Sequence, residues 1–193
     1  MSANVTAVRA FPGRTTSTTL CRHPGCTEKE TLPHVLGKCP TNELLRNTRH
    51  HSVRSTIANE LKRQGWSVDE ELNCLSEDSS TRRCDIVATN PTKTQVLILD
   101  PTVRFEQTVT QATDVDREKK ALYEPCIADL SRRLQIDKDK FKVIGLLFGA
   151  RGAVPSFTFD VLRNLGIPSK VILDVALKML KDSVHIVNIH LFH

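Results

Sequence analysis

Apolar residues recur along residues 42–64 at the spacing of one helical face. They stand three, four, seven or eight positions apart, at Leu44, Leu45, Val53, Ile57, Ala58 and Leu61. This repeat predicts an amphipathic helix with a basic outer face. Thr41 or Asn42 can cap the start of the helix, and Gly65 can end it.

Short apolar runs bounded by turn residues follow this helix. They predict strands at residues 66–75, 83–88 and 95–105, with a polar hairpin loop at 77–81 and a turn at 90–92. Residues 140–150 are apolar enough for a central strand.

The remaining pattern is helical. A helix is expected over residues 112–134, interrupted or kinked by Pro125, and the tail from residue 157 predicts two helices separated by the break at 166–168. The order of helix, strands, helix, strand and helices predicts an α/β fold with a mixed sheet between helices.

Length and composition place the chain among globular proteins. The 193 residues suffice for one ordinary domain and a small appendage, and 39% hydrophobic with 25% charged residues excludes a disordered class. No secretory leader and no apolar run of about 18 residues is visible, so we expect an intracellular protein with no membrane-spanning segment. Six cysteines in such a protein favour metal binding over a disulfide framework.

The basic charge is concentrated in the first third of the chain. Residues 1–63 carry ten Lys/Arg against four Asp/Glu, a net charge of +6, whereas residues 64–193 carry seventeen against eighteen. This asymmetry is typical of a surface that meets phosphates, although a solvated basic helix gives the same count about as often.

A cysteine and histidine cluster lies in CRHPGCTEKETLPHVLGKC. Cys21, Cys26, His34 and Cys39 are separated by four, seven and four residues, which matches two ligand pairs of a tetrahedral zinc site. A segment this short buries no core of its own, so zinc would supply its folding free energy. The four ligands fill the coordination shell, so this zinc is expected to be structural. Cys74, Cys84 and Cys126 are expected to be core thiols, and His185, His190 and His193 to be solvated at a helix end.

Two aspartates stand at the ends of predicted strands, Asp85 before IVA and Asp100 after VLIL. A buried carboxylate needs a partner or a metal ion. Two carboxylates on adjacent strands with a nearby lysine can hold Mg²⁺ for phosphodiester hydrolysis, the plan of PD-(D/E)xK nucleases. The lysine usual two residues after the second acid is replaced by Thr102, but Lys119 or Lys120 on the following helix could take its role. Alternatively, Asp85 pairs with Arg82, Arg83 or Arg104 and Asp100 only caps a turn.

Taken in order, several segments resemble the C-terminal part of polyproteins of site-specific non-LTR retrotransposons. The segments are CRHPGC…ETLPHVLGKCP, the RHH helix, GWSV, RRCDIVA, ILDPTVRFE, REKKALY and FGARGAVP, over about residues 20–168. In that family a zinc knuckle and a restriction-like endonuclease follow a reverse transcriptase.

The resemblance implies a role for particular residues. Asp85 and Asp100 would bind Mg²⁺, and Lys119 with Tyr123 would complete the catalytic site. Arg49, His50, Arg54, Arg82 and Arg83 are expected to contact DNA.

The resemblance also implies a working context. The enzyme would nick target DNA in the nucleus to prime reverse transcription, with element RNA and a full-length element polymerase as further partners. The expected organisation is a flexible lead-in (1–20), a CCHC zinc knuckle (21–40), a restriction-endonuclease-like core (41–168) and a C-terminal helix (169–193). No polymerase precedes the knuckle, so we expect a fragment or remnant of an element.

Two alternatives stay open. The chain could be a DNA-binding module that no longer cuts, or a structural zinc protein, which would leave both aspartates unexplained.

Overall fold

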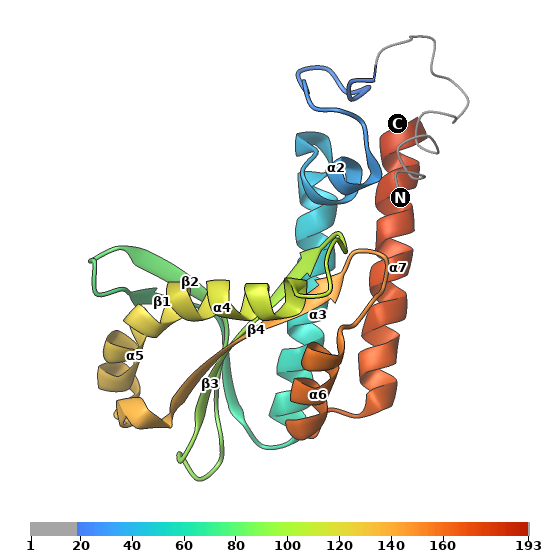
Figure 1. Ribbon diagram of the computed structural model, residues 1–193. Helices are drawn as coiled ribbons and strands as arrows, with labels where there is room; N and C mark the ends of the chain where they lie inside the picture. Colours follow the sequence, from blue (N-terminus) through green and yellow to red (C-terminus); the bar gives the residue numbers. More distant parts are fainter. Residues whose placement is uncertain (1–18, 193) are drawn as a thin grey trace.

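The computed structural model describes residues 19–192 (Figure 1). The predicted lead-in therefore lies, up to residue 18, outside the described residues, and so does His193. No helix within residues 19–192 combines the length and the apolar character that crossing a membrane requires.

Four strands form one mixed sheet in the order β1-β2-β3-β4. The strands are β1 (Ser67–Leu75), β2 (Thr81–Thr89), β3 (Val96–Arg104) and β4 (Phe141–Gly149). Neighbours are antiparallel except β3 and β4, which are parallel. The four predicted strands are confirmed. Alternating or continuous apolar runs between turn residues are a local signal of extended backbone.

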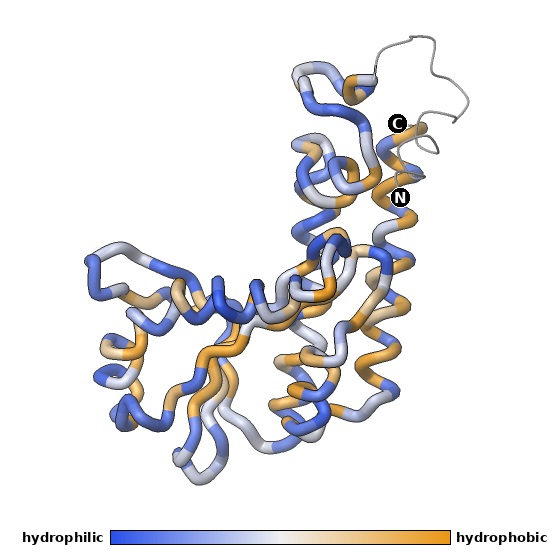
Figure 2. Tube along the Cα trace, viewed as in Figure 1, coloured by the Kyte–Doolittle hydropathy of each residue, from blue (hydrophilic) through white to orange (hydrophobic). Residues whose placement is uncertain are grey.

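Helices cover both faces of this sheet. One face carries α3 (Glu43–Arg63), α6 (Ser156–Asn164) and α7 (Ser169–Phe192). The other face carries α4 (Gln111–Tyr123) and α5 (Ile127–Leu134), joined by the short turn η2 (Glu124–Cys126) that holds the predicted proline break. Figure 2 shows hydrophobic positions concentrated along the central strands, whereas the hairpins at the ends of the sheet are hydrophilic. The predicted mixed α/β architecture is confirmed.

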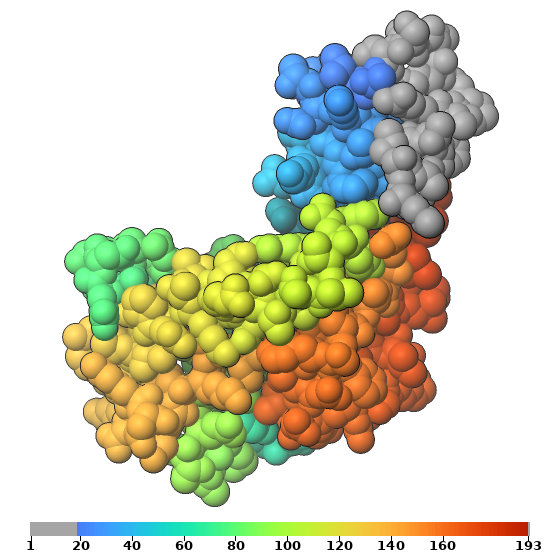
Figure 3. All heavy atoms as spheres, viewed as in Figure 1, coloured from blue at the N-terminus to red at the C-terminus, as the bar shows by residue number. Residues whose placement is uncertain are grey.

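The segment of residues 21–40, called here the Cys/His segment, projects beyond the sheet (Figures 1 and 3). It contains α2 (Leu32–Gly37) and leads through η1 (Pro40–Asn42) into α3. Its apolar residues Val35 and Leu36 pack with Ile186 and Leu191 of α7. The short α2 was not predicted, because six residues are too few to reveal a helical period.

Two predictions about α3 need correction. Arg49 and Arg54 are 2% and 7% exposed, so the prediction of an outer basic face is wrong for these two residues. Asn42 does occupy the residue before α3, but its side chain makes no capping hydrogen bond there. The prediction that Cys74, Cys84 and Cys126 are core thiols is confirmed by their burial.

Candidate functional site

Strands β2 and β3 separate at the two predicted aspartates. Their antiparallel ladder ends at the pair Ile86–Leu99, so the next residue on one strand is Asp85 and on the other Asp100. Beyond this point β2 continues beside β1 alone and β3 beside β4 alone. Pro101 is tolerated here because β3 no longer needs a donor toward β2. The fold therefore opens a gap in the sheet where both carboxylates stand.

The backbone is irregular around Asp85. In a regular strand residues 84 and 86 share one face, but Cys84 packs with α5 and Ile86 packs with α3. Glu71, which lies opposite Asp85 by the register of β1 and β2, has a φ of 53°. Such irregularities re-aim side chains and recur at functional sites. The break in alternation turns Asp85 toward α3.

Asp100 is buried and receives several donors. Tyr123 Oη donates to Asp100 Oδ2 over 2.9 Å, and Thr102 Oγ1 donates to Oδ1 over 2.8 Å. The ammonium of Lys119 lies 3.2 Å from Oδ1. Burial, and then the negative charge of Asp100, raises the pKa of Tyr123, so its hydroxyl stays protonated as a donor. The alternative in which Asp100 caps a turn is wrong, because Asp100 lies within β3.

The structure separates the roles of the two candidate lysines. Lys119 faces Asp100 with its side chain 15% exposed, whereas Lys120 pairs with Asp116 over 2.6 Å. Consecutive helical residues point about 100° apart, so only one of them can reach the strand. Lys119 is therefore the lysine that contacts Asp100.

A glycine allows this close approach of α4. Gly145 pairs with Asp100 across the parallel ladder. A Cβ at this position would lie 2.8 Å from the carbonyl oxygen of Val115 and 2.9 Å from Cγ of Lys119. The missing side chain thus lets α4 lie directly on β4, close enough for Lys119 to reach across to β3.

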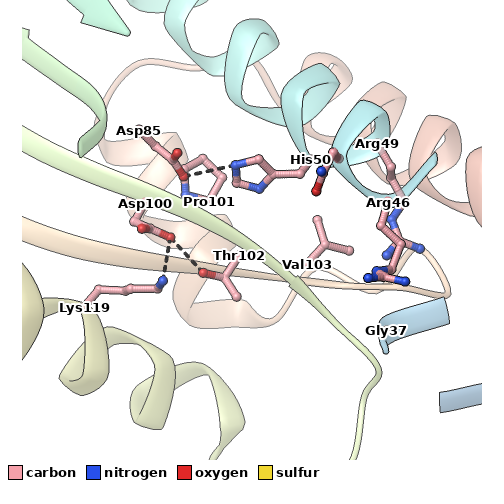
Figure 4. A pocket seen from close by; sticks show the side chains of 11 residues that line it. Gly37, Arg46, Arg49, His50, Asp85, Asp100, Pro101, Thr102, Val103 and Lys119 are labelled. Carbon is pink, nitrogen blue, oxygen red and sulfur yellow. Dashed lines mark hydrogen bonds and ion pairs between the residues drawn. The ribbon is translucent and has the colours of Figure 1, made fainter. Parts of the chain in front are cut away.

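Asp85 is approached from the opposite helix. His50 Nε2 of α3 lies 3.2 Å from Asp85 Oδ2. Among the described residues no arginine pairs with Asp85, so the predicted alternative of an arginine partner is not found. Figure 4 shows His50 reaching Asp85 from one side and Lys119 reaching Asp100 from the other.

The two aspartates open onto a pocket of about 330 Å³. Its wall is lined by Gly37, Arg46, Asn47, Arg49, His50, Asp85, Asp100, Pro101, Thr102, Val103 and Lys119. A second hollow of about 400 Å³ shares Gly37 and Val103 with it and extends past Lys38, Arg104 and Phe105. The two hollows adjoin and lead from the carboxylates to the Cys/His segment.

The residues predicted to contact DNA are dispersed. Arg49 donates to Ser183 Oγ over 2.7 Å and to the carbonyl of Leu36 over 2.9 Å, and burial lowers the pKa of its guanidinium to about 10. Arg49 thus ties α3 to α7 and α2 while one side of it lines the pocket.

Arg54 is bound to Glu70 and Glu71, at 3.2 and 2.8 Å. Arg82 and Arg83 lie outside the pocket, on the part of β2 beside the hairpin with β1. Their DNA contacts stay predictions.

Arg46 is a pocket residue that the sequence reasoning missed. It stands four residues before His50 on α3, hence on the same helical face, and its guanidinium donates to the carbonyl of Cys39. The spacing of the two residues could have revealed it.

The four predicted zinc ligands come together. Their ligand atoms all lie within 4.8 Å of one another. Cys21 Sγ and Cys39 Sγ are 3.8 Å apart, and Cys26 Sγ and His34 Nε2 are 3.4 Å apart. Tetrahedral zinc places two thiolates about 3.8 Å apart and a thiolate about 3.5 Å from an imidazole nitrogen. The cluster therefore has the donor types and the spacing that suit zinc.

The protonation of this cluster reflects its burial. Burial raises the pKa of the Cys21 thiol to about 12 and lowers the pKa of His34. A neutral His34 is ready to bind a metal ion, whereas the Cys21 thiolate needs a nearby cation to form at neutral pH.

The prediction that His190 is solvated is wrong. Its side chain is fully buried at the end of α7, where it lies against His23 and Asn42. His185, by contrast, is exposed as predicted.

Comparison with known proteins points to retrotransposable elements. No protein-family model matches the chain. A "Retrovirus-related Pol polyprotein from type-1 retrotransposable element R2" of Popillia japonica is 27% identical over 161 residues, which cover 79% of this chain and 31% of the relative. A second polyprotein with the same name and organism is 36% identical over 63 residues, which cover 33% of this chain and 9% of the relative. The chain thus spans less than a third of either relative, and the similarity supports its origin in a non-LTR retrotransposon.

Proposed function

We propose that the chain is a metal-dependent DNA endonuclease domain of a non-LTR retrotransposon polyprotein. The observation that carries the proposal is the pair of aspartates at the opening between β2 and β3, with Lys119 beside one of them. PD-(D/E)xK nucleases have an acidic pair on adjacent strands of a mixed sheet with a lysine beside it. Here the lysine would come from α4, because Thr102 stands two residues after the second acid.

Asp85 and Asp100 would hold Mg²⁺, which prefers carboxylate oxygens and keeps water in its shell. When bound, the ion would polarise the scissile phosphate and help form hydroxide from water. The carboxylates face a pocket of about 330 Å³ that has room for a phosphodiester.

Lys119 would stabilise the charge that develops on the phosphate, or orient the attacking water. Its ammonium is already held within the pocket by Asp100. Tyr123 and Thr102 would keep the carboxylate of Asp100 in one orientation through their hydrogen bonds. His50 would do the same for Asp85.

The adjoining hollows suggest where a DNA strand would run. From the aspartates the surface continues past Arg46 and then past Lys38 and Arg104 toward the Cys/His segment. Basic side chains along such a path favour the phosphate backbone without reading sequence. Nuclear action, element RNA and a polymerase partner remain parts of this proposal that rest on the resemblance.

The second candidate is a zinc-containing DNA-binding fragment that does not cut. The Cys/His cluster and the basic N-terminal third of the chain support it equally well. This second candidate does not explain why Asp85, Asp100, Lys119 and Tyr123 lie together where β2 and β3 separate.

Nicking of supercoiled plasmid with Mg²⁺ tests the proposal. The comparison uses the native chain, Asp100→Asn and Asp116→Asn, at DNA concentrations that give equal binding. Asp116 is a matched control because it is also a buried carboxylate but lies outside the pocket. It pairs with Lys120, and its Oδ1 accepts from the amide of Gly145, a hydrogen bond that the Oδ1 of asparagine can keep.

Loss of nicking in Asp100→Asn alone, at least about a hundredfold, would support the nuclease. Equal nicking by Asp100→Asn and the native chain would refute it. Steeply salt-dependent DNA binding without nicking by any of the three would favour the binding fragment.

A further inference from the structure

The end of α7 reaches the Cys/His cluster through a buried histidine. His190 Nε2 lies 3.9 Å from Cys21 Sγ and 3.7 Å from Glu30 Oε2, and all three residues are buried. Cys21 and Glu30 precede His190 by 169 and 160 positions in the sequence. Tertiary contact alone joins them.

Asn42 determines which nitrogen of His190 carries the proton. Asn42 Nδ2 lies 3.0 Å from the carbonyl oxygen of Val35, which can only accept, so this atom must be the amide nitrogen. The same nitrogen lies 3.1 Å from His190 Nδ1. Its second hydrogen therefore points at Nδ1, which must accept. The proton of a neutral His190 is thus on Nε2, the atom that faces both Cys21 Sγ and the carboxylate of Glu30.

The loop after Cys21 also caps α7. Arg22 donates to the carbonyl of Leu191 over 2.8 Å, and His23 Nε2 donates to the carbonyl of His190 over 3.1 Å. The last carbonyls of a helix lack intrahelical donors, and a cation near them is favourable. Residues 21–23 thus hold the helix end through its backbone as well as through the imidazole of His190.

We propose that His190 is an outer-sphere part of the zinc site: its Nε2–H points at the Cys21 thiolate, so zinc binding locks the end of α7 onto the Cys/His segment. An N–H donor to a zinc-bound thiolate stabilises the charge on sulfur, and such outer partners commonly contribute about 10–100-fold to metal affinity. Through Cys21, the metal would join the first and last parts of the described chain. The inference rests on the zinc site itself.

Zinc affinity is measured by competition with a chromophoric chelator for the native chain, His190→Phe, His190→Gln and His185→Phe. We expect His190→Phe to bind zinc about 10–100-fold more weakly. His190→Gln, which keeps an N–H donor, should recover part of this loss. His185→Phe is the matched control on the exposed side of α7 and should not change the affinity.

Hydrogen exchange of the native chain gives a readout that needs no variant. With zinc, the amides of residues 186–192 should exchange at least about tenfold more slowly than after chelation, because locking the helix end suppresses its local opening. Exchange at this helix end that zinc does not change, or equal zinc affinity in His190→Phe, would overturn the inference while leaving the zinc site intact. A native chain that retains no zinc would instead refute the zinc site, and the inference with it.

Discussion

Replacing Lys119 with methionine tests the central geometry of the proposed nuclease. The change keeps an unbranched apolar side chain as long as the lysine stem up to Cε, but removes the ammonium 3.2 Å from Asp100 Oδ1. The side chains of Lys119 and Asp100 are 15% and 6% exposed, so water screens the pair little. Removing one partner would leave a buried carboxylate without its cation.

The expected cost follows from what remains around Asp100. Breaking a buried ion pair usually costs about 3–5 kcal/mol. The hydroxyls of Tyr123 and Thr102 still donate to this carboxylate, so we expect the lower end, about 3 kcal/mol. For a chain of this size that corresponds to a fall in Tm of about 6–12 °C. Lys120→Met removes the same charge from an i,i+4 pair in which the lysine is 40% exposed, so water can take the place of the ammonium beside Asp116 and the change should cost less, about 1 kcal/mol.

Mg²⁺ should partly reverse the loss. An ion bound by Asp85 and Asp100 replaces the missing positive charge, so Lys119→Met should gain more stability from Mg²⁺ than the native chain does. At ten times its dissociation constant the ion adds about 1.4 kcal/mol. Urea denaturation with 0 and saturating Mg²⁺ measures both effects, and Asp100→Asn in the Lys119→Met background should abolish the Mg²⁺ effect.

Two results would refute this reasoning. If Lys119→Met lowers the free energy of unfolding by no more than Lys120→Met does, the buried Lys119–Asp100 pair does not stabilise the fold as its geometry requires. If Mg²⁺ stabilises Lys119→Met and the double variant equally, the ion does not bind at Asp100.

Three further changes test other parts of the structure. Gly145→Ala should cost about 1–3 kcal/mol, because its Cβ would press on α4; nicking should fall more than in a control of equal instability, and unchanged Tm and nicking would contradict the close approach. Tyr123→Phe should cost about 1.5–3 kcal/mol by removing a donor to a charged carboxylate, seen as a lower urea midpoint; an unchanged midpoint would show that the bond contributes nothing. Arg49→Met should lower Tm by leaving buried acceptors unpaired, whereas weaker DNA binding at native Tm would mean that Arg49 acts on DNA instead.

Much of the fold could be predicted because its signals are local. The four strands and the helices α3 to α7 follow from apolar periodicity and from breaks such as Pro125 and Gly166. The four residues of the candidate zinc site could be picked out from their spacing, since a metal shell restricts how far apart its ligands can stand. Asp85 and Asp100 stood out because a carboxylate at the end of an apolar strand needs an explanation.

The tertiary structure alone decided which polar groups meet. A helical repeat does not tell that Arg49 is buried against α7, or that His190 faces Cys21 rather than water. The orientation of α4, set by its contact with Gly145, selected Lys119 over Lys120. Periodicity reports which side of an element is apolar, whereas the partner of a buried charge depends on elements distant in sequence. The sequence by itself therefore determined the elements and the candidate ligands, and the packing of the helices on the sheet decided the site that they form.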